Sequence, residues 1–388
     1  MRIKNARVVY ILLLIFLISC EEKYWPELDN KYESLLVVEG MITNKPGPYT
    51  INLSLSTTVR TSKYIPLSGY ELKITDDSGQ EETLTENKAG EYSTSLSGIQ
   101  GVIGKKYQLT INAPDGRTYK SEFEELTIPT GIESVYAEVE YREDLNYYHD
   151  LAGYQFYLDT YNAENDSNYY LWQLEATYKY RSDFLIRFIF DHFTLSPFPK
   201  PDSLQICWKT DKIQEIFIYN TLDLSEPKIT RLPLNYVTTE ARELSIRYSL
   251  LVKQFSITEK AYDFWNSVKE QNVEQGALYT KQPYQIRGNL FNTKNPDEPV
   301  LGYFLVAGIS EKRIYVGRPP PPVLMYYPVC VITDFDIERF GFIYWTDGTT
   351  WPLYVTETAE GVRALTHQAC VDCRFKGGTI EKPDYWED

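Results

Sequence analysis

The chain has 388 residues, of which 43% are hydrophobic and 24% are charged, as in folded globular proteins rather than disordered chains. Its formal net charge of −15 argues against a nucleic-acid-binding protein, because such proteins need a positive surface that displaces counterions from phosphate. Tyrosine is abundant, with 33 residues beside 17 Phe and 7 Trp, which suits both β-sheet faces and binding surfaces.

The first nineteen residues have the features of a secretory signal peptide. Arg2, Lys4 and Arg7 form a positive start, and an apolar run follows from Val8 to Ile18. At about 1.5 Å of rise per residue, this run is too short to cross a hydrocarbon core of about 30 Å as a helix. We therefore predict that residues 1–19 are a signal peptide and not a membrane anchor.

The sequence around Cys20 predicts a lipid anchor. Leu17-Ile18-Ser19-Cys20 resembles the bacterial lipobox, in which the peptide is cut before an acylated cysteine. An ordinary signal peptide with an incidental cysteine is the alternative. We predict that residues 20–32 are a tether held in outer-membrane lipid through Cys20. Glu21 and Glu22 resemble the signal that exports Bacteroidota lipoproteins to the cell surface, and a periplasm-facing location is the alternative.

From Leu35 onward, apolar and polar residues alternate in short segments, which is typical of strands with one buried face. Turn sequences such as Asp76-Asp77-Ser78-Gly79 and Pro114-Asp115-Gly116 separate these segments. We predict an immunoglobulin-like or transthyretin-like β-sandwich over residues 33–128. The expected strands are Leu35–Val38, Tyr49–Leu55, Tyr70–Ile74 and Lys106–Ile111.

A second β-rich domain is expected over residues 129–318, again of the immunoglobulin-like or transthyretin-like type, which makes the fold class all-β (mainly β). One amphipathic helix, 258–272, is expected to lie across an open end of this sandwich. Ser256 and Glu259 have the capping-box spacing, and Thr258 is a second possible N-cap. The apolar stripe is Ala261, Phe264, Trp265 and Val268. Residues 319–388 are predicted to be a C-terminal extension that caps the second domain.

The cysteines after the anchor predict disulfide bonds, because exported proteins oxidise their thiols. These residues are Cys207, Cys330, Cys370 and Cys373. The CxxC spacing of the last two is also found in zinc sites, but His367 is the only nearby further ligand. We expect one bond from Cys330 to either Cys370 or Cys373, which joins the extension to the rest of the chain.

Catalytic motifs are absent from the sequence. The three histidines, His149, His192 and His367, stand in unrelated contexts, and no nucleophile elbow, P-loop or zinc-protease motif occurs. The acidic run Asp334–Glu338 is interpreted as a solvated strand face. We predict a protein without enzymatic activity, cofactor or metal. A carboxylate-based hydrolase is an alternative, because a glycosidase needs only two carboxylates.

Several segments resemble a family of Bacteroidota lipoproteins known as domain-of-unknown-function family 4249. They are Tyr248–Phe255, Ala261–Trp265, Arg287–Asn289 and Cys370–Trp386. The resemblance implies an outer-membrane lipoprotein that accompanies a TonB-dependent transporter, with no known reaction. A surface glycan-binding module and a purely structural envelope protein are alternatives, and the sequence does not identify a small-molecule or glycan ligand.

An acidic chain is repelled by an anionic membrane surface, so contact with a transporter is expected through aromatic surface of low charge. The candidates are Phe188 and Phe198, in and after the apolar run Phe184–Phe193, and Tyr326 and Tyr327. The alternative is that these side chains pack into the core of their own domain.

Overall fold

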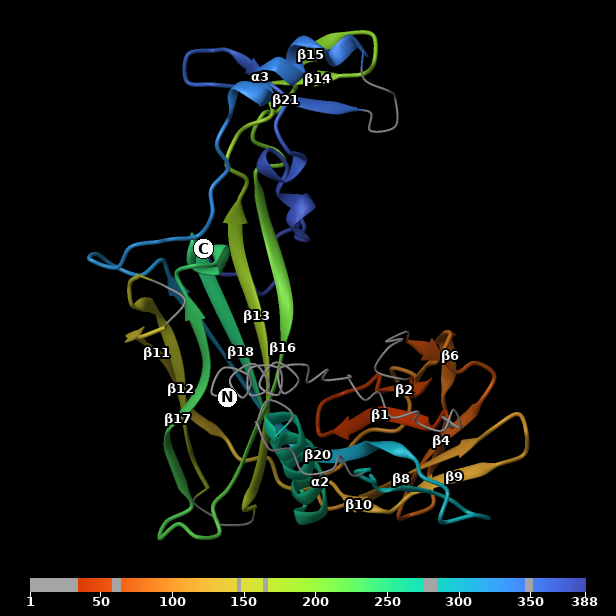
Figure 1. Cartoon of the computed structure of the whole chain (residues 1–388). Helices are drawn as coiled ribbons and strands as arrows, with labels where there is room; N and C mark the ends of the chain where they lie inside the picture. Colours follow the sequence, from red (N-terminus) through yellow and green to blue (C-terminus); the bar gives the residue numbers. More distant parts are fainter. Residues whose placement is uncertain (1–33, 58–63, 145–147, 163–166, 275–284, 346–351) are drawn as a thin grey trace, which may run out of the picture.

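The computed structural model describes residues 34–57, 64–144, 148–162, 167–274, 285–345 and 352–388. These residues form an elongated molecule: an N-terminal sandwich, a second sandwich and a small module at the far end (Figure 1). The predicted signal peptide 1–19, the tether 20–32 and Cys20 lie outside the described residues. Within the described ranges, no helix is long and apolar enough to cross a membrane.

The N-terminal sandwich consists of two sheets that enclose a core with Val38, Ile51, Leu72 and Leu109. The strands of the first sheet are β1 (Leu36–Thr43), β2 (Thr50–Leu55), β3 (Ile65–Pro66), β6 (Thr85–Lys88) and β7 (Glu91–Ser93). Those of the second are β4 (Glu71–Asp76), β5 (Glu81–Thr83), β8 (Lys106–Asn112), β9 (Thr118–Ser121), β10 (Glu124–Glu125) and β19 (Leu290–Asn292). The four strands expected here from alternation correspond to β1, β2, β4 and β8.

The second sandwich has one long-stranded sheet and one three-stranded sheet, with Phe156, Trp172 and Leu250 in the core between them. The first contains β13 (Tyr169–Arg181), β16 (Ile206–Asn220) and β18 (Arg247–Ser256), and the second contains β11 (Ile132–Arg142), β12 (Leu151–Tyr161) and β17 (Lys228–Thr238). A short 3-10 helix, Arg242–Leu244, precedes β18. The predicted all-β fold class is therefore confirmed.

Strand β20 (Leu301–Gly317) joins the two sandwiches. Its residues 301–307 pair in parallel with β1, and residues 308–317 pair antiparallel with β18, so that one nine-stranded sheet runs through both sandwiches. The segment between β10 and β11 crosses this strand at Gly308, where an added Cβ would lie 2.3 Å from the Thr127 carbonyl oxygen. Residues 290–307 thus belong to the N-terminal sandwich, and not to the second domain as the expected boundaries 129–318 imply.

Helix α2 (Glu259–Glu274) covers the outer face of the long sheet near the junction of the sandwiches (Figure 1). Leu171 and Phe255 face the helix, and Ala261 is fully buried against them. The helix therefore covers a sheet face rather than the open end that we expected. Thr258 is the N-cap, since its hydroxyl accepts from the Ala261 N–H at 3.3 Å. The alternative N-cap, Ser256, instead accepts from the Thr130 N–H.

The distal module, defined here as residues 184–204 and 333–372, contains a four-stranded sheet and a helix. They are β14 (Phe188–Phe190), β15 (Leu195–Pro197), β21 (Leu353–Glu357), β22 (Arg363–Ala364) and α3 (Asp334–Gly341), with 3-10 helices at Ile343–Trp345 and Gln368–Cys370. We expected residues 319–388 to cap the second domain. Instead, they form part of a separate module, because β21 of this extension pairs with β14, which lies within the range 129–318. The end of the chain, with the 3-10 helix Cys373–Lys376, does return to the second sandwich, where Trp386 packs on Trp208.

Candidate partner surface

Residues 319–332, which we name the strap, connect the second sandwich to the distal module. No charged residue occurs from Pro319 to Thr333, in a chain of which 24% is charged. The strap runs along the outer side of the molecule as an irregular segment (Figure 1). Met325 packs on the core of the second sandwich, and the Arg242 guanidinium lies 5.0 Å from the centre of the Tyr327 ring. These contacts hold the lower part of the strap in place.

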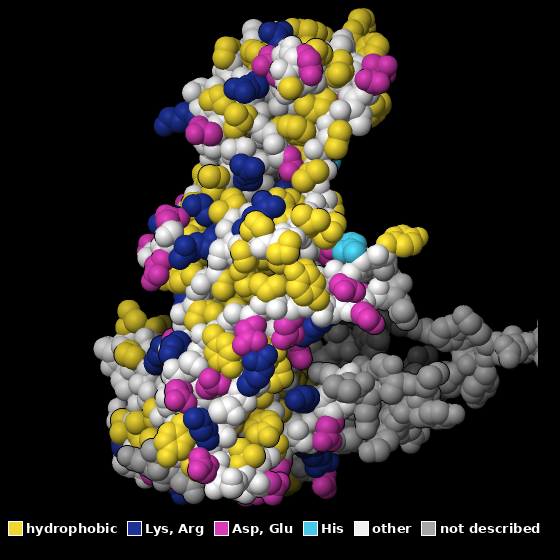
Figure 2. Space-filling view, turned by 90° about the vertical axis from the view of Figure 1, so that its left-hand side faces the viewer, with side chains coloured by type: hydrophobic (Ala, Val, Ile, Leu, Met, Phe, Trp, Pro, Cys, Tyr) yellow, Lys and Arg dark blue, Asp and Glu magenta, His cyan; other side chains and the backbone are white. Residues whose placement is uncertain are grey.

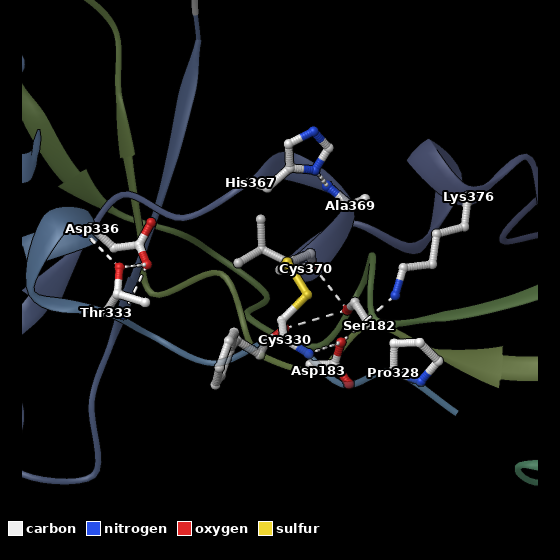
Figure 3. The surroundings of a disulfide bond; sticks show 12 residues. Ser182, Asp183, Pro328, Cys330, Thr333, Asp336, His367, Ala369, Cys370 and Lys376 are labelled. Atoms are coloured by element: carbon white, nitrogen blue, oxygen red, sulfur yellow. Dashed lines mark hydrogen bonds and ion pairs between the residues drawn. A yellow bond between two sulfur atoms is a disulfide. The ribbon is translucent and has the colours of Figure 1, made fainter. Parts of the chain in front are cut away.

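Two disulfide bonds fix the base of the distal module: Cys207–Cys373 and Cys330–Cys370. The second is one of the two pairings expected for Cys330, and it ties the strap to the end of the module (Figure 3). The first joins β16 to the end of the chain, a pairing that the sequence left open. This bond, and not the Cys330 bond that we expected, joins the extension 319–388 to the rest of the chain, because Cys330 and Cys370 both lie within the extension. Both cysteines of the CxxC pair are therefore in disulfides rather than in a zinc site.

The Asp183 carboxylate lies beside the Cys330–Cys370 disulfide and contacts several polar and charged groups there (Figure 3). It accepts hydrogen bonds from the Arg242 guanidinium at 2.7 Å and from the Cys330 N–H at 3.1 Å, and the Lys376 ammonium lies 3.6 Å away. Burial, and then the neighbouring Arg242, lower the pKa of Lys376. Asp183 thus ties the second sandwich, the strap and the tail together through one carboxylate.

The strap and the distal module expose many large apolar side chains, which we name the apolar surface. Two of the most exposed are Trp345 at 85% and Phe193 at 80%. The others are Leu324, Tyr326, Val329, Val331, Phe335, Phe342, Tyr344 and Val362. Figure 2 views the side of the molecule that carries the strap, and hydrophobic side chains gather there over the second sandwich and the module. Exposed apolar area of this kind marks interaction sites in soluble proteins.

The four residues expected to contact a partner divide into two groups. Phe188 and Phe198 are half-buried and pack against the two small cores of the distal module, so the alternative interpretation holds for them. Tyr326 is exposed and stacks on His149 with ring centroids 4.0 Å apart, while Tyr327 is half-buried below Arg242. His149 is also paired with Glu240 at 3.0 Å.

Sequence reasoning missed the aromatic residues that follow Thr333. The acidic run 334–338 is not a strand face but the start of α3, where the Thr333 hydroxyl and Asp336 form a capping box. The Thr333-x-x-Asp336 spacing is the signal that could have predicted this helix. Phe335 lies on α3, and Phe342 and Tyr344 follow directly after it, so the helix places these rings on the module's surface.

A cleft on the N-terminal sandwich and the distribution of metal-binding side chains give weaker indications of a functional site. A cleft of about 630 Å³ opens on the N-terminal sandwich beside Tyr70 and Tyr119. Two of its charged groups pair with one another, since Glu298 accepts from Arg117 at 2.9 Å, and Glu298 also accepts from the Tyr119 hydroxyl at 2.7 Å. Among the residues that the structure covers, no group of three or more His, Cys, Asp or Glu side chains could hold a metal ion. The apolar surface is the more distinctive feature.

Comparison with protein families shows a match to the model described as "Domain of unknown function (DUF4249)", over residues 21–313. Comparison with curated proteins gives no match. The matched range ends within β20, so the strap and the C-terminal part of the distal module follow it. Since the match spans well over half of the chain, this protein belongs to the DUF4249 family.

Proposed function

We propose that this protein is a lipid-anchored accessory protein of the outer membrane, displayed at the cell surface. It has no enzymatic activity and binds a TonB-dependent transporter through the apolar surface. The signal peptide and the lipobox ending at Cys20 support the anchor, and the proposal of a non-enzymatic role rests on the sequence, in which no catalytic motif occurs.

The apolar surface is the observation on which the proposal rests. Phe335, Phe342 and Trp345 are bulky rings exposed to solvent, and aromatic anchors of this kind dominate the binding energy of protein interfaces. A membrane surface is a poorer occupant, because a chain with net charge −15 is repelled by anionic lipid. A lipid tether would confine the protein to the membrane plane and raise its effective concentration near a membrane partner.

The partner proposal is tested by a charge placed on the apolar surface of the full-length lipidated protein. Phe335→Glu should abolish co-purification of the transporter from detergent-solubilised outer membranes and leave the melting temperature unchanged, because the ring is exposed. Leu96→Glu is the matched control, since Leu96 is also exposed but lies on the N-terminal sandwich. Wild-type protein that purifies without any transporter would contradict the proposal.

The anchor is tested separately by Cys20→Ala. Stable anchoring needs more than one acyl chain, and each buried CH₂ contributes about 0.8 kcal/mol. The variant should remain unprocessed or be recovered in the soluble fraction after cell lysis. A variant that is processed and membrane-bound like the wild type would rule out lipidation at Cys20.

A further inference from the structure

The upper part of the strap carries backbone groups without partners. Within the described part of the chain, the N–H and C=O groups of Val329, Val331 and Ile332 make no hydrogen bonds. Between them, the Cys330 N–H bonds to the Asp183 carboxylate. Exposure alternates along this segment, since Val329 and Val331 are exposed and Cys330 between them is half-buried, as in an extended chain. Successive N–H groups of such a chain point to opposite sides, so those of Val329 and Val331 are directed away from Asp183. One edge of the strap therefore faces solvent.

This edge lacks the features that usually prevent pairing with another chain. Natural proteins protect exposed strand edges with charged residues, prolines or bulges. The strap has prolines at 319–322 and at Pro328, but residues 329–332 are Val-Cys-Val-Ile, with no proline and no charge. Valine and isoleucine favour extended backbone. Val329 and Val331 expose their side chains, whereas Cys330 is held in its disulfide.

We propose that residues 329–332 of the strap bind an extended, uncharged segment of the partner polypeptide as an added β-strand. A polypeptide backbone is the ligand whose donors and acceptors match an unpaired strand edge, whereas a lipid headgroup would need the charged groups that the strap lacks. The segment's side chains would pack against Val329 and Val331. This inference rests on the proposed function only in that the partner is taken to be a transporter.

Contacts at the base of the distal module fix the conformation of residues 329–331. The Cys330–Cys370 disulfide and the hydrogen bond from the Cys330 N–H to Asp183 both act at the residue between the two exposed valines. A segment held in its bound conformation loses less conformational entropy on association than a free loop does. The valine N–H groups are thus presented on a fixed rather than a freely moving chain.

The test removes one N–H group and leaves the side chain apolar. Val331→Pro in the full-length lipidated protein should reduce its assembly into the native outer-membrane complex about tenfold or more, the effect of one lost hydrogen bond at the upper end of the usual range. Val331→Thr keeps the N–H group and a β-branched side chain, and it should retain assembly. Leu324→Pro is the matched control, since it places a proline in the same strap outside the proposed edge. Assembly is measured by native electrophoresis, and melting temperatures check folding.

The outcomes separate this inference from the proposed function. Loss of assembly with Val331→Pro alone supports strand addition, whatever protein the complex contains. Wild-type assembly of Val331→Pro with a transporter would overturn strand addition and leave the proposed function standing. Equal loss with Val331→Pro and Val331→Thr would also overturn it, because the side chain rather than the N–H group would then decide binding. A wild-type protein that assembles with nothing in the membrane overturns both.

Discussion

Glu124 is the buried acid with the clearest consequence for stability. It lies at the junction of the sandwiches with 4% of its surface exposed, and it accepts a hydrogen bond from the Tyr303 hydroxyl. Burial raises the pKa of Glu124 from 4.5 to about 7, and the nearby Glu122 adds to this effect, although Lys260 pairs with Glu122. The folded protein therefore keeps a proton that the unfolded chain releases near pH 4.5.

Stability should consequently fall as the pH rises from about 4.5 to about 7, because the proton that the folded state holds is lost on unfolding. The decrease from this one group is about 3 kcal/mol, at 1.36 kcal/mol per pKa unit. Glu124→Gln should remove this part of the decrease and stabilise the protein at pH 8. Melting temperatures of both proteins at pH 5 and pH 8 check this, and an equal fall in both would contradict it.

Individual residues also show what sequence can and cannot predict. The pairing of Cys330 with one member of the CxxC pair was predicted from redox chemistry, but the choice of Cys370 depends on how the tail folds back. Phe188 and Phe198 looked like exposed aromatic residues, because the sequence does not reveal that β14 pairs with β21, far away in the chain. The partners of such residues are set by long-range contacts.

Among the elements, helix α2 shows how local signals compete. Ser256 and Thr258 both had plausible N-cap spacing, and the structure selects Thr258 because Ser256 is the last residue of β18. Short strands such as β2 and β8 were predicted because alternation with one buried face is a local pattern. By contrast, α3 was missed because an acidic run is common in an acidic protein.

The capping role of Thr258 gives a measurable prediction. Thr258→Ala should lower the free energy of unfolding by about 1 kcal/mol, because the Ala261 N–H loses its acceptor. Denaturation in urea measures the change. A variant as stable as the wild type would show that the cap contributes nothing.

The strap-to-module disulfide should also be needed for stability. Replacing Cys330 and Cys370 together by Ala opens a loop between residues 40 apart in sequence, and chain entropy then predicts a loss of about 4 kcal/mol. Guanidinium unfolding of the double variant measures this loss. As a control, thiol titration of the denatured wild-type protein should find no free thiol among residues 207, 330, 370 and 373. Free thiols there, or bound zinc, would contradict the observed pairing.

At the scale of the whole molecule, β20 explains why the domain boundary could not be located from sequence. Residues 303–309 are buried without a break, yet the pairing partner changes within this run, from β1 up to Ala307 to β18 from Gly308 onward. Nothing in the buried run itself shows where the partner changes. The same strand joins the sandwiches into one sheet, and the strap begins directly after it. The apolar surface is thus attached to a continuous sheet. This arrangement favours the proposal that the protein binds its partner through the end that carries the distal module.

The most direct test of the proposed function is cross-linking in intact outer membranes, followed by mass spectrometry of the cross-linked peptides. A photoreactive phenylalanine analogue is placed at Phe342 on the apolar surface and, as the control, at Leu96 on the N-terminal sandwich, both of which are exposed. The proposal predicts that Phe342 cross-links to a TonB-dependent transporter and that Leu96 does not. The proposal would be contradicted if position 342 cross-linked to lipid alone. It would also be contradicted if only position 96 cross-linked to the transporter.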